Sequence, residues 1–226
     1  MFNTKSILMM SAFICLSFHG AHAQQPTLLS NALNPPAIQP EFRHTVFIKE
    51  DEFEGLARID PAMPAGQRVS LVTSTLAADD PDMLALLADA DAEPMDGFWC
   101  HEMGALVPER VIEMERDERS VTYQFAPQPE ADSDKDDITF MKNVTGEVRV
   151  DRQSGTVASL RLFAKKPFRI SLAVKINAFE MHARCAALPS GGSHLVESTT
   201  QIKARALFRQ LEQVEIKRIS DVEPVD

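Results

Sequence analysis

The pair His101-Glu102 has the residue types that open a zinc-protease motif, in which two histidines four residues apart bind the metal. The second histidine of such a motif would stand at position 105, which is Ala105. The other histidines beyond residue 23 are scattered and lack the spacing of metal ligands; they are His44, His182 and His194. We expect these side chains to be surface residues or partners in structural hydrogen bonds.

An acidic segment has the beginning of a calcium-loop pattern. Asp89, Asp91 and Glu93 follow the 1-3-5 spacing of the first ligands, but Pro94 occupies the glycine position and Cys100 stands where a glutamate completes the loop. The chain also contains no glycine-rich phosphate loop and no Gly-x-Ser-x-Gly motif. We therefore expect a protein that is not an enzyme and that has no catalytic residue, metal site or cofactor.

The first 23 residues have the organisation of a secretory signal peptide. A single positive charge at Lys5 precedes a mostly apolar stretch over residues 7–18. Ala21 and Ala23 then provide the small residues that a signal peptidase accepts, which predicts cleavage after Ala23. An uncleaved anchor fits less well, because this stretch is shorter than the ~20 residues that span a bilayer. We expect an exported, periplasmic protein.

Three cysteines occur in the chain, and the predicted cleavage leaves two of them. Cys15 is a poor lipidation site because the large Ile14 precedes it. The remaining pair, Cys100 and Cys185, predicts one disulfide in an oxidising compartment. The alternatives are two buried free thiols, or a catalytic pair of Cys100 with His101. Neighbouring residues of a strand point to opposite faces, which argues against that pair.

Length and charge narrow the class of protein. Of 226 residues, 23 are Lys or Arg and 33 are Asp or Glu, which gives a formal net charge of −10. This length fits a single domain over residues 24–226. Nucleic acid is excluded as a partner, because its phosphates need clustered cations. The same charge argues against more than peripheral or transient contact with envelope membranes, and we expect a monomer.

Most of the predicted domain consists of short strands. The expected strands cover residues 42–50, 53–59, 68–75, 111–115, 120–125, 144–150, 156–164 and 195–204. One short helix is expected over residues 27–33, and a clearer one begins after the N-cap Asp80 and ends near Ala90. Residues 126–137 contain prolines and acids and predict an exposed loop. For Ala206–Ser220 the periodicity leaves strand and helix open.

Residues 168–188 show the longest alternation of apolar and polar side chains. Apolar residues alternate over residues 168–176, and after Asn177 the pattern resumes from Phe179 to Cys185. Such a pattern predicts long strands with one apolar face. The fold class is therefore mainly β with a few helices (α+β), in which a single curved antiparallel sheet curls around its apolar face.

The stretch from Phe140 to Val225 resembles the C-terminal half of LolA-like periplasmic proteins, the superfamily of outer-membrane lipoprotein carriers. The similar segments are Gly146–Asp151, Leu160–Leu162, Phe168–Asn177 and Lys203–Phe208. The resemblance implies one LolA-like domain, a half-open β-barrel with one to three helices covering its mouth and a hydrophobic interior that holds acyl chains. It also implies a strand over Ala206–Ser220.

Export, alternation and resemblance together suggest a non-catalytic carrier that binds acyl chains of lipids or of a lipoprotein. Burying about a dozen methylenes would contribute up to about 10 kcal/mol before ordering costs. The residues expected to line the cavity are Val148, Val150, Leu160, Leu162, Phe168, Ile170, Leu172, Val174 and Ile176. The alternative is that this face is plain core, because every sheet domain buries one face.

A second function remains open at this stage. The protein would then be a structural or assembly module of the envelope that binds a protein partner through a sheet edge or through the acidic loop.

Overall fold

The computed structural model describes residues 25–34, 39–77, 79–129, 133–207 and 209–225. The expected signal peptide lies outside these residues. In the described part, eleven strands form one antiparallel sheet in the order β3-β2-β1-β11-β10-β9-β7-β6-β5-β4, with β8 paired to β9. The strands are β1 (Phe42–Glu50), β2 (Phe53–Ile59), β3 (Val69–Ser74), β4 (Ile112–Arg116), β5 (Ser120–Phe125), β6 (Val144–Asp151), β7 (Val157–Ala164), β8 (Phe168–Arg169), β9 (Val174–Ala187), β10 (Ser193–Ala206) and β11 (Arg209–Pro224).

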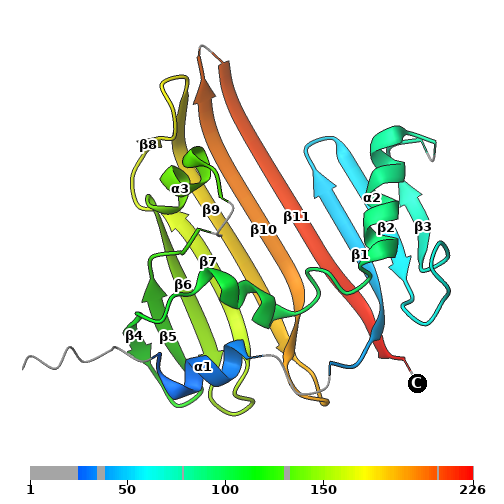
Figure 1. Ribbon diagram of the computed structural model, residues 1–226, viewed down its shortest axis with the longest axis horizontal. Coiled ribbons are helices and arrows are strands. Elements are labelled where there is room, and N and C mark those ends of the chain that lie inside the picture. Colours follow the sequence, from blue (N-terminus) through cyan, green and yellow to red (C-terminus); the bar gives the residue numbers. More distant parts are fainter. Residues whose placement is uncertain (1–24, 35–38, 78, 130–132, 208, 226) are drawn as a thin grey trace, which may run out of the picture.

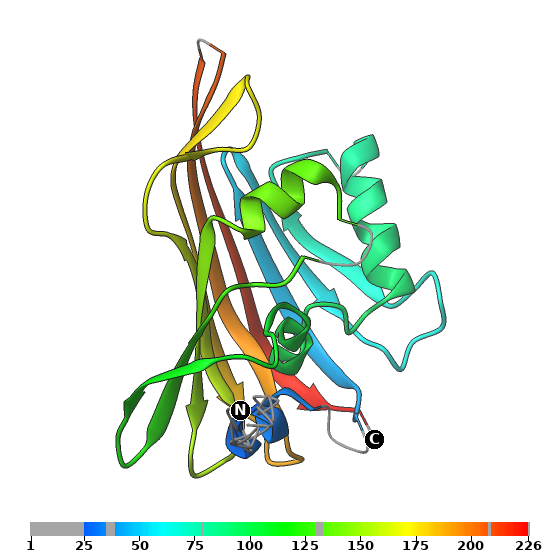
Figure 2. The same cartoon turned by 60° about the vertical axis from the view of Figure 1, so that its left-hand side comes forward.

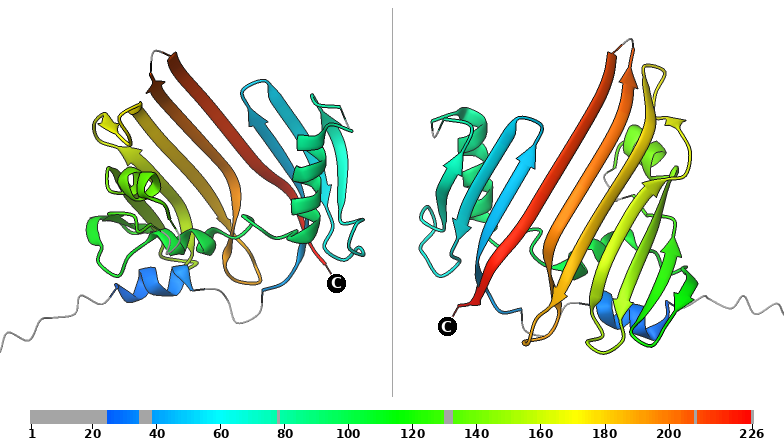
Figure 3. Two further views of the ribbon diagram at one scale, coloured as in Figure 1. Left: turned by 45° about the horizontal axis from the view of Figure 1, so that its top comes forward. Right: turned by 180° about the vertical axis from the view of Figure 1, so that it is seen from behind.

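The sheet is curved and not closed, and its helices lie on its concave side (Figure 1, Figure 2). They are α1 (Thr27–Leu33), α2 (Pro81–Ala92), the 3₁₀ helix η1 (Cys100–Leu106) and α3 (Lys135–Met141). Seen from behind, the convex side of the described sheet is bare (Figure 3). The predicted fold class, a single curved antiparallel sheet with a few helices on one side, is confirmed. Among the described residues, no helix has both the length and the apolar content that crossing a membrane requires.

The strand alternation explains the main core. In β5, Val121, Tyr123 and Phe125 are buried, and they lie opposite the equally buried inner face of β6. Phe125 lies opposite Gly146, where an added Cβ would be 2.3 Å from the Phe125 ring. A glycine is therefore needed at this position for the ring to lie flat on the sheet.

A disulfide and backbone bonds attach the segment before η1 to the sheet. Cys100 and Cys185 are bonded, as predicted, with their Cα atoms 6.3 Å apart. One residue earlier, Trp99 forms an isolated bridge to His194, and the carbonyl of Phe98 accepts a hydrogen bond of 2.8 Å from the Leu195 amide. These bonds hold the chain that leaves α2 against β9 and β10.

Two sequence expectations are wrong in detail. Residues 168–176 are not one strand, because the chain reverses after Arg169. In this reversal the amides of Ile170 and Ser171 both donate hydrogen bonds to the carbonyl of Val174. The two-residue β8 then pairs back on β9. Residues 126–137 are not loop throughout, because Asp134 caps a helix that starts at Lys135. The open question at Ala206–Ser220 is settled as strand rather than helix from Arg209 onward: Ala206 is the last residue of β10, and β11 extends from Arg209 to Pro224.

A hollow between helix α2 and the concave face

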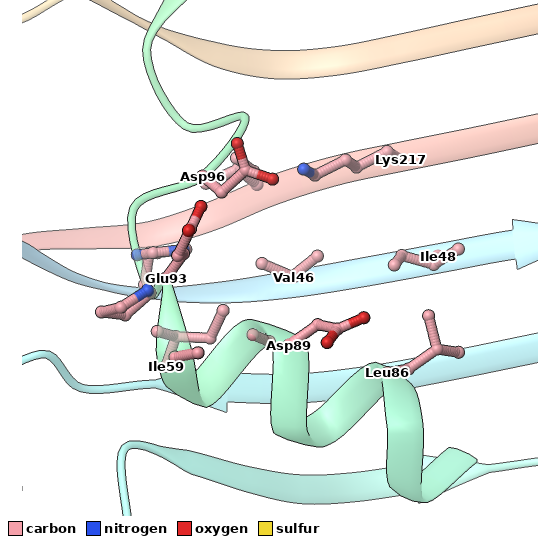
Figure 4. A pocket seen from close by; sticks show the side chains of 13 residues that line it. Val46, Ile48, Ile59, Leu86, Asp89, Glu93, Asp96 and Lys217 are labelled. Carbon is pink, nitrogen blue, oxygen red and sulfur yellow. The ribbon is translucent and has the colours of Figure 1, made fainter. Parts of the chain in front are cut away.

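The candidate binding site is a hollow of about 450 Å³ beside α2, which combines an apolar floor with charged side chains (Figure 4). It lies where α2 leaves β1 and β11 partly uncovered. Its lining combines apolar and charged side chains, namely His44, Val46, Ile48, Ile59, Leu86, Asp89, Ala90, Ala92, Glu93, Pro94, Asp96, Lys217 and Ile219.

The floor of the hollow is apolar and comes from strands that are distant in sequence. Val46 of β1 lies opposite Ile219 of β11, and Ile59 of β2 lies beside His44. Towards the outer edge of the sheet the hollow continues into a smaller recess of about 90 Å³ under α2. The two spaces share lining residues, which are Val46, Ile48, Ile59, Leu86 and Ala90. They therefore form one continuous apolar floor.

One face of α2 forms the wall. The helix starts at the N-cap Asp80, whose carboxylate accepts a hydrogen bond of 2.9 Å from the Asp82 amide. Residues three and four apart share a helical face, and the residues that line the hollow have this spacing: Leu86, Asp89, Ala90 and Glu93. The wall therefore carries two carboxylates among its apolar side chains.

Lys217 forms the charged end of the hollow. It lies opposite Ile48 on the concave face of β11, and its ammonium is directed toward the Asp96 carboxylate (Figure 4). Burial lowers the pKa of Lys217, while Asp96 and Glu215 act in the opposite direction. The Nζ atom is 3.5 Å from the carbonyl oxygen of Gly97, and a Cβ added at that glycine would be 2.7 Å from Nζ. A side chain at position 97 would therefore displace the ammonium.

Asp91 attaches the C-terminal end of α2 to the sheet. Its two carboxylate oxygens accept hydrogen bonds of 2.6 Å and 2.8 Å from the amides of Gly66 and Arg68, in the β2–β3 connection. The Gly66 bond is the largest cause of the lowered pKa of Asp91. The helix has only one fully buried residue, Met83. The bonds of Asp91 are therefore a substantial part of what positions α2.

The structure does not bring together the residues whose sequence patterns partly matched a calcium loop or a zinc-protease motif. Asp91 binds backbone amides, whereas Asp89 and Glu93 face the hollow, so the three carboxylates do not converge. His101 is buried in η1, and its Nε2 accepts a hydrogen bond of 2.9 Å from the Gln39 amide. Among the described residues, no group of three or more His, Cys, Asp or Glu is placed to hold a metal ion.

The residues expected to line a cavity lie elsewhere. Four of them are buried in the main core, which are Val148, Val150, Leu160 and Leu162. Phe168 and Ile176 form a second small core with Ala204, and Ile170 and Val174 pack against it. Leu172 is 98% exposed, so its expected place in a cavity is wrong: it lies in the chain reversal between β8 and β9. None of these nine residues lines the hollow.

Sequence reasoning missed the residues that do line it, because they come from β1, β2, α2, the segment after α2 and β11, between positions 44 and 219. One local signal was available. The predicted helix carries Asp89 and Glu93 on the same face as Leu86 and Ala90. A carboxylate is costly to bury without a partner, so acids on the inner face of a helix indicate an open hollow beside that face.

An apolar floor with charged groups at one end can bind an amphiphile, whose chain is buried while its head remains near Lys217 and the carboxylates. No protein-family model, no curated protein and no solved structure matches this chain.

Proposed function

We propose that this protein is a non-catalytic carrier in the periplasm that binds an acyl chain of a lipid or of a lipoprotein. The observation that carries the proposal is the hollow under α2. Its volume of about 450 Å³ is within the range of about 300–1,000 Å³ of small-molecule sites. Its floor is apolar, and the continuing recess offers room for the end of a chain.

Energy and location agree with this assignment. Each buried methylene contributes about 0.8 kcal/mol, so burial of about a dozen methylenes contributes about 10 kcal/mol against the cost of binding and ordering the chain. The Cys100–Cys185 disulfide is compatible with an oxidising, exported environment. The LolA-like resemblance supports the same function.

A matched pair of substitutions on α2 tests the proposal. Ala90 lines both the hollow and its recess, whereas Ala85 is exposed on the same helix and lines neither space. Ala90→Phe fills the space and is expected to weaken binding of a fluorescent palmitate analogue at least tenfold. Ala85→Phe makes the same change outside the hollow and is expected to leave the affinity within twofold of the unchanged protein.

The ligand itself is sought by mass spectrometry of organic extracts of the protein purified from its native host. We expect a lipid or acylated peptide in extracts of the unchanged protein and of Ala85→Phe, at much lower occupancy in Ala90→Phe. Equal loading of both variants, or repeated absence of any acyl compound, would refute the carrier function.

A second function, an envelope assembly module, is favoured by the edge strand β4. All five residues of β4 are exposed, including the apolar Ile112 and Met114, and within the described part of the chain β4 has a partner strand on one side only. An edge of this kind can accept a strand from another protein. Crosslinking from position 112 to a single envelope protein, in a preparation free of lipid, would favour this function over the carrier.

A further inference from the structure

Two chain reversals protrude together at one end of the sheet, beyond the helices (Figure 2). We call this end, formed by residues 165–175, 203–207 and 209–212, the sheet tip. It carries the most exposed large apolar side chain among the described residues, Leu172, at 98% exposure. Leu207 is 69% exposed and Leu211 is 52% exposed at the same end. An isolated exposed leucine needs no explanation, but three of them on one protrusion do.

The two reversals are joined into one unit. The Leu207 amide donates a hydrogen bond of 2.8 Å to the carbonyl of Ala173, which is the neighbour of Leu172 in sequence. Beneath them, Phe168, Ile176 and Ala204 form the second small core. The exposed leucines are therefore presented side by side on a packed base.

The backbone at Leu207 also indicates a function for this turn. Its φ is +54°, a left-handed conformation that glycine or asparagine adopts more easily than leucine. A large apolar residue in this place stabilises neither the turn nor the core. Its use is explained if the side chain meets a partner outside the molecule.

Positively charged side chains are concentrated in the sheet tip. The sheet tip holds seven of the 23 Lys and Arg of the chain but only one of its 33 Asp and Glu, which is Glu212. Glu212 pairs with Lys203 at 2.8 Å. The other six cations make no ion pair within the described part of the chain; they are Lys165, Lys166, Arg169, Lys175, Arg205 and Arg209. The net charge of −10 conceals this strongly basic end.

We propose that the sheet tip docks on an anionic lipid bilayer. Leu172 and Leu207 insert among the acyl chains, and the surrounding cations lie at the level of the phosphate groups, an arrangement in which apolar burial and electrostatic attraction add. A narrow protrusion offers less area than a stable protein interface requires. The long strands β9, β10 and β11 would then stand away from the membrane surface (Figure 1).

A local fluorescence probe tests insertion. In Leu172→Trp the new indole is exposed, whereas Trp99 is buried at 3% exposure and gives a constant background. With vesicles of phosphatidylcholine containing 30% phosphatidylglycerol, we expect a blue shift, and quenching by brominated acyl chains. With pure phosphatidylcholine we expect binding at least tenfold weaker, and high salt should weaken binding to the anionic vesicles. Because the probe reports on position 172 alone, insertion through the apolar residues 7–18 would leave it unchanged.

Matched variants separate the sheet tip from the remaining surface. Leu172→Asp with Leu207→Asp, and separately Arg205→Glu with Arg209→Glu, are each expected to weaken vesicle binding at least tenfold. Their controls change the same residue types elsewhere: Leu84→Asp on α2, where Leu84 is 51% exposed, and Arg110→Glu with Arg119→Glu. These controls, and the hollow-filling Ala90→Phe, are expected to bind vesicles like the unchanged protein. Circular dichroism verifies that each variant is folded.

Three results would overturn the proposal. One is an indole that stays at its aqueous emission wavelength on anionic vesicles. Another is a loss of binding that is equal in the tip variants and in their controls. The third is a dimer, seen by light scattering, that Leu172→Asp with Leu207→Asp dissociates, because the tip would then be an interface between two copies of the chain.

Discussion

At the scale of single residues, three histidines pack against an aromatic cluster formed by Phe42, Phe98 and Trp99. His44 is 2% exposed, its ring lies 4.9 Å from that of Phe98, and its Nδ1 donates to the carbonyl of Phe42. The ring of His194 stacks on the same Phe98 at 5.5 Å. Burial is the largest cause of the lowered pKa of His44, His101 and His194. Lys217 and His194 lower the pKa of His44 further, because they repel its protonated form.

These histidines predict acid sensitivity in a defined pH range. A histidine with a lowered pKa in the folded state binds its proton more readily in the unfolded chain, whose value is near 6.5. The free energy of unfolding should therefore fall as the pH decreases below 6.5, by up to about 1.4 kcal/mol per pH unit for each additional proton bound. Urea titrations from pH 7.5 to 5 measure this slope. His44→Phe should reduce it, whereas His182→Gln, at an exposed position, should not; equal slopes would contradict the assignment.

A second residue-scale prediction concerns Gly146. In Gly146→Ala the new Cβ would be 2.3 Å from the Phe125 ring, so one of them must move. Overpacking of this kind costs about 1–3 kcal/mol. We expect urea unfolding to show a loss of this size, and Phe125→Leu with Gly146→Ala to lose less than the sum of the two single changes. Additive losses would indicate that the ring is not the obstacle.

At the scale of elements, the disulfide determines how the helical segment is held on the sheet. It joins the start of η1 to β9 across 85 residues of sequence. In the chain-entropy account a loop of this length contributes up to about 4.6 kcal/mol, by limiting the unfolded chain. Cys100→Ala with Cys185→Ala should therefore lower the free energy of unfolding by about 2–5 kcal/mol. Unfolding with and without reductant provides the check, and a loss below 1 kcal/mol would refute a structural role.

The sequence predicted those elements that are formed by interactions between residues close together in the chain. Alternation is local, so strands such as β5, β6 and β7 were predicted within a residue or two of their observed bounds. The break at residues 170–173 was missed, because Leu172 continues the apolar alternation although the chain turns there. The hollow was missed for a different reason. Its floor requires β11 to lie next to β1, a pairing between the two ends of the chain that no local pattern contains.

At the scale of the whole molecule, the two ends of the sheet are built differently. The inner faces of β5, β6 and β7 share one core with α1, η1 and the disulfide, and this core extends under α2 through Val46 and Ile59. At the other end, α2 covers β1–β3 with a single fully buried side chain, Met83, which lies outside that core. Elements with few buried contacts open at a lower free energy than the global unfolding. Helix α2 is therefore the element that can open to admit a chain into the hollow.

Hydrogen exchange with mass spectrometry tests this division. Amides of α2 should exchange much faster than those of β6 and β7, and bound palmitate should slow α2 alone. Asp91→Ala removes the acceptor of the Gly66 and Arg68 amides and should speed exchange in α2 at least threefold, with β6 unchanged. Asp89→Ala is the control, because Asp89 is on the same helix and faces the hollow. If α2 and β6 exchanged at one common rate in every variant, the helix would open only by global unfolding, and a ligand would need another way into the hollow.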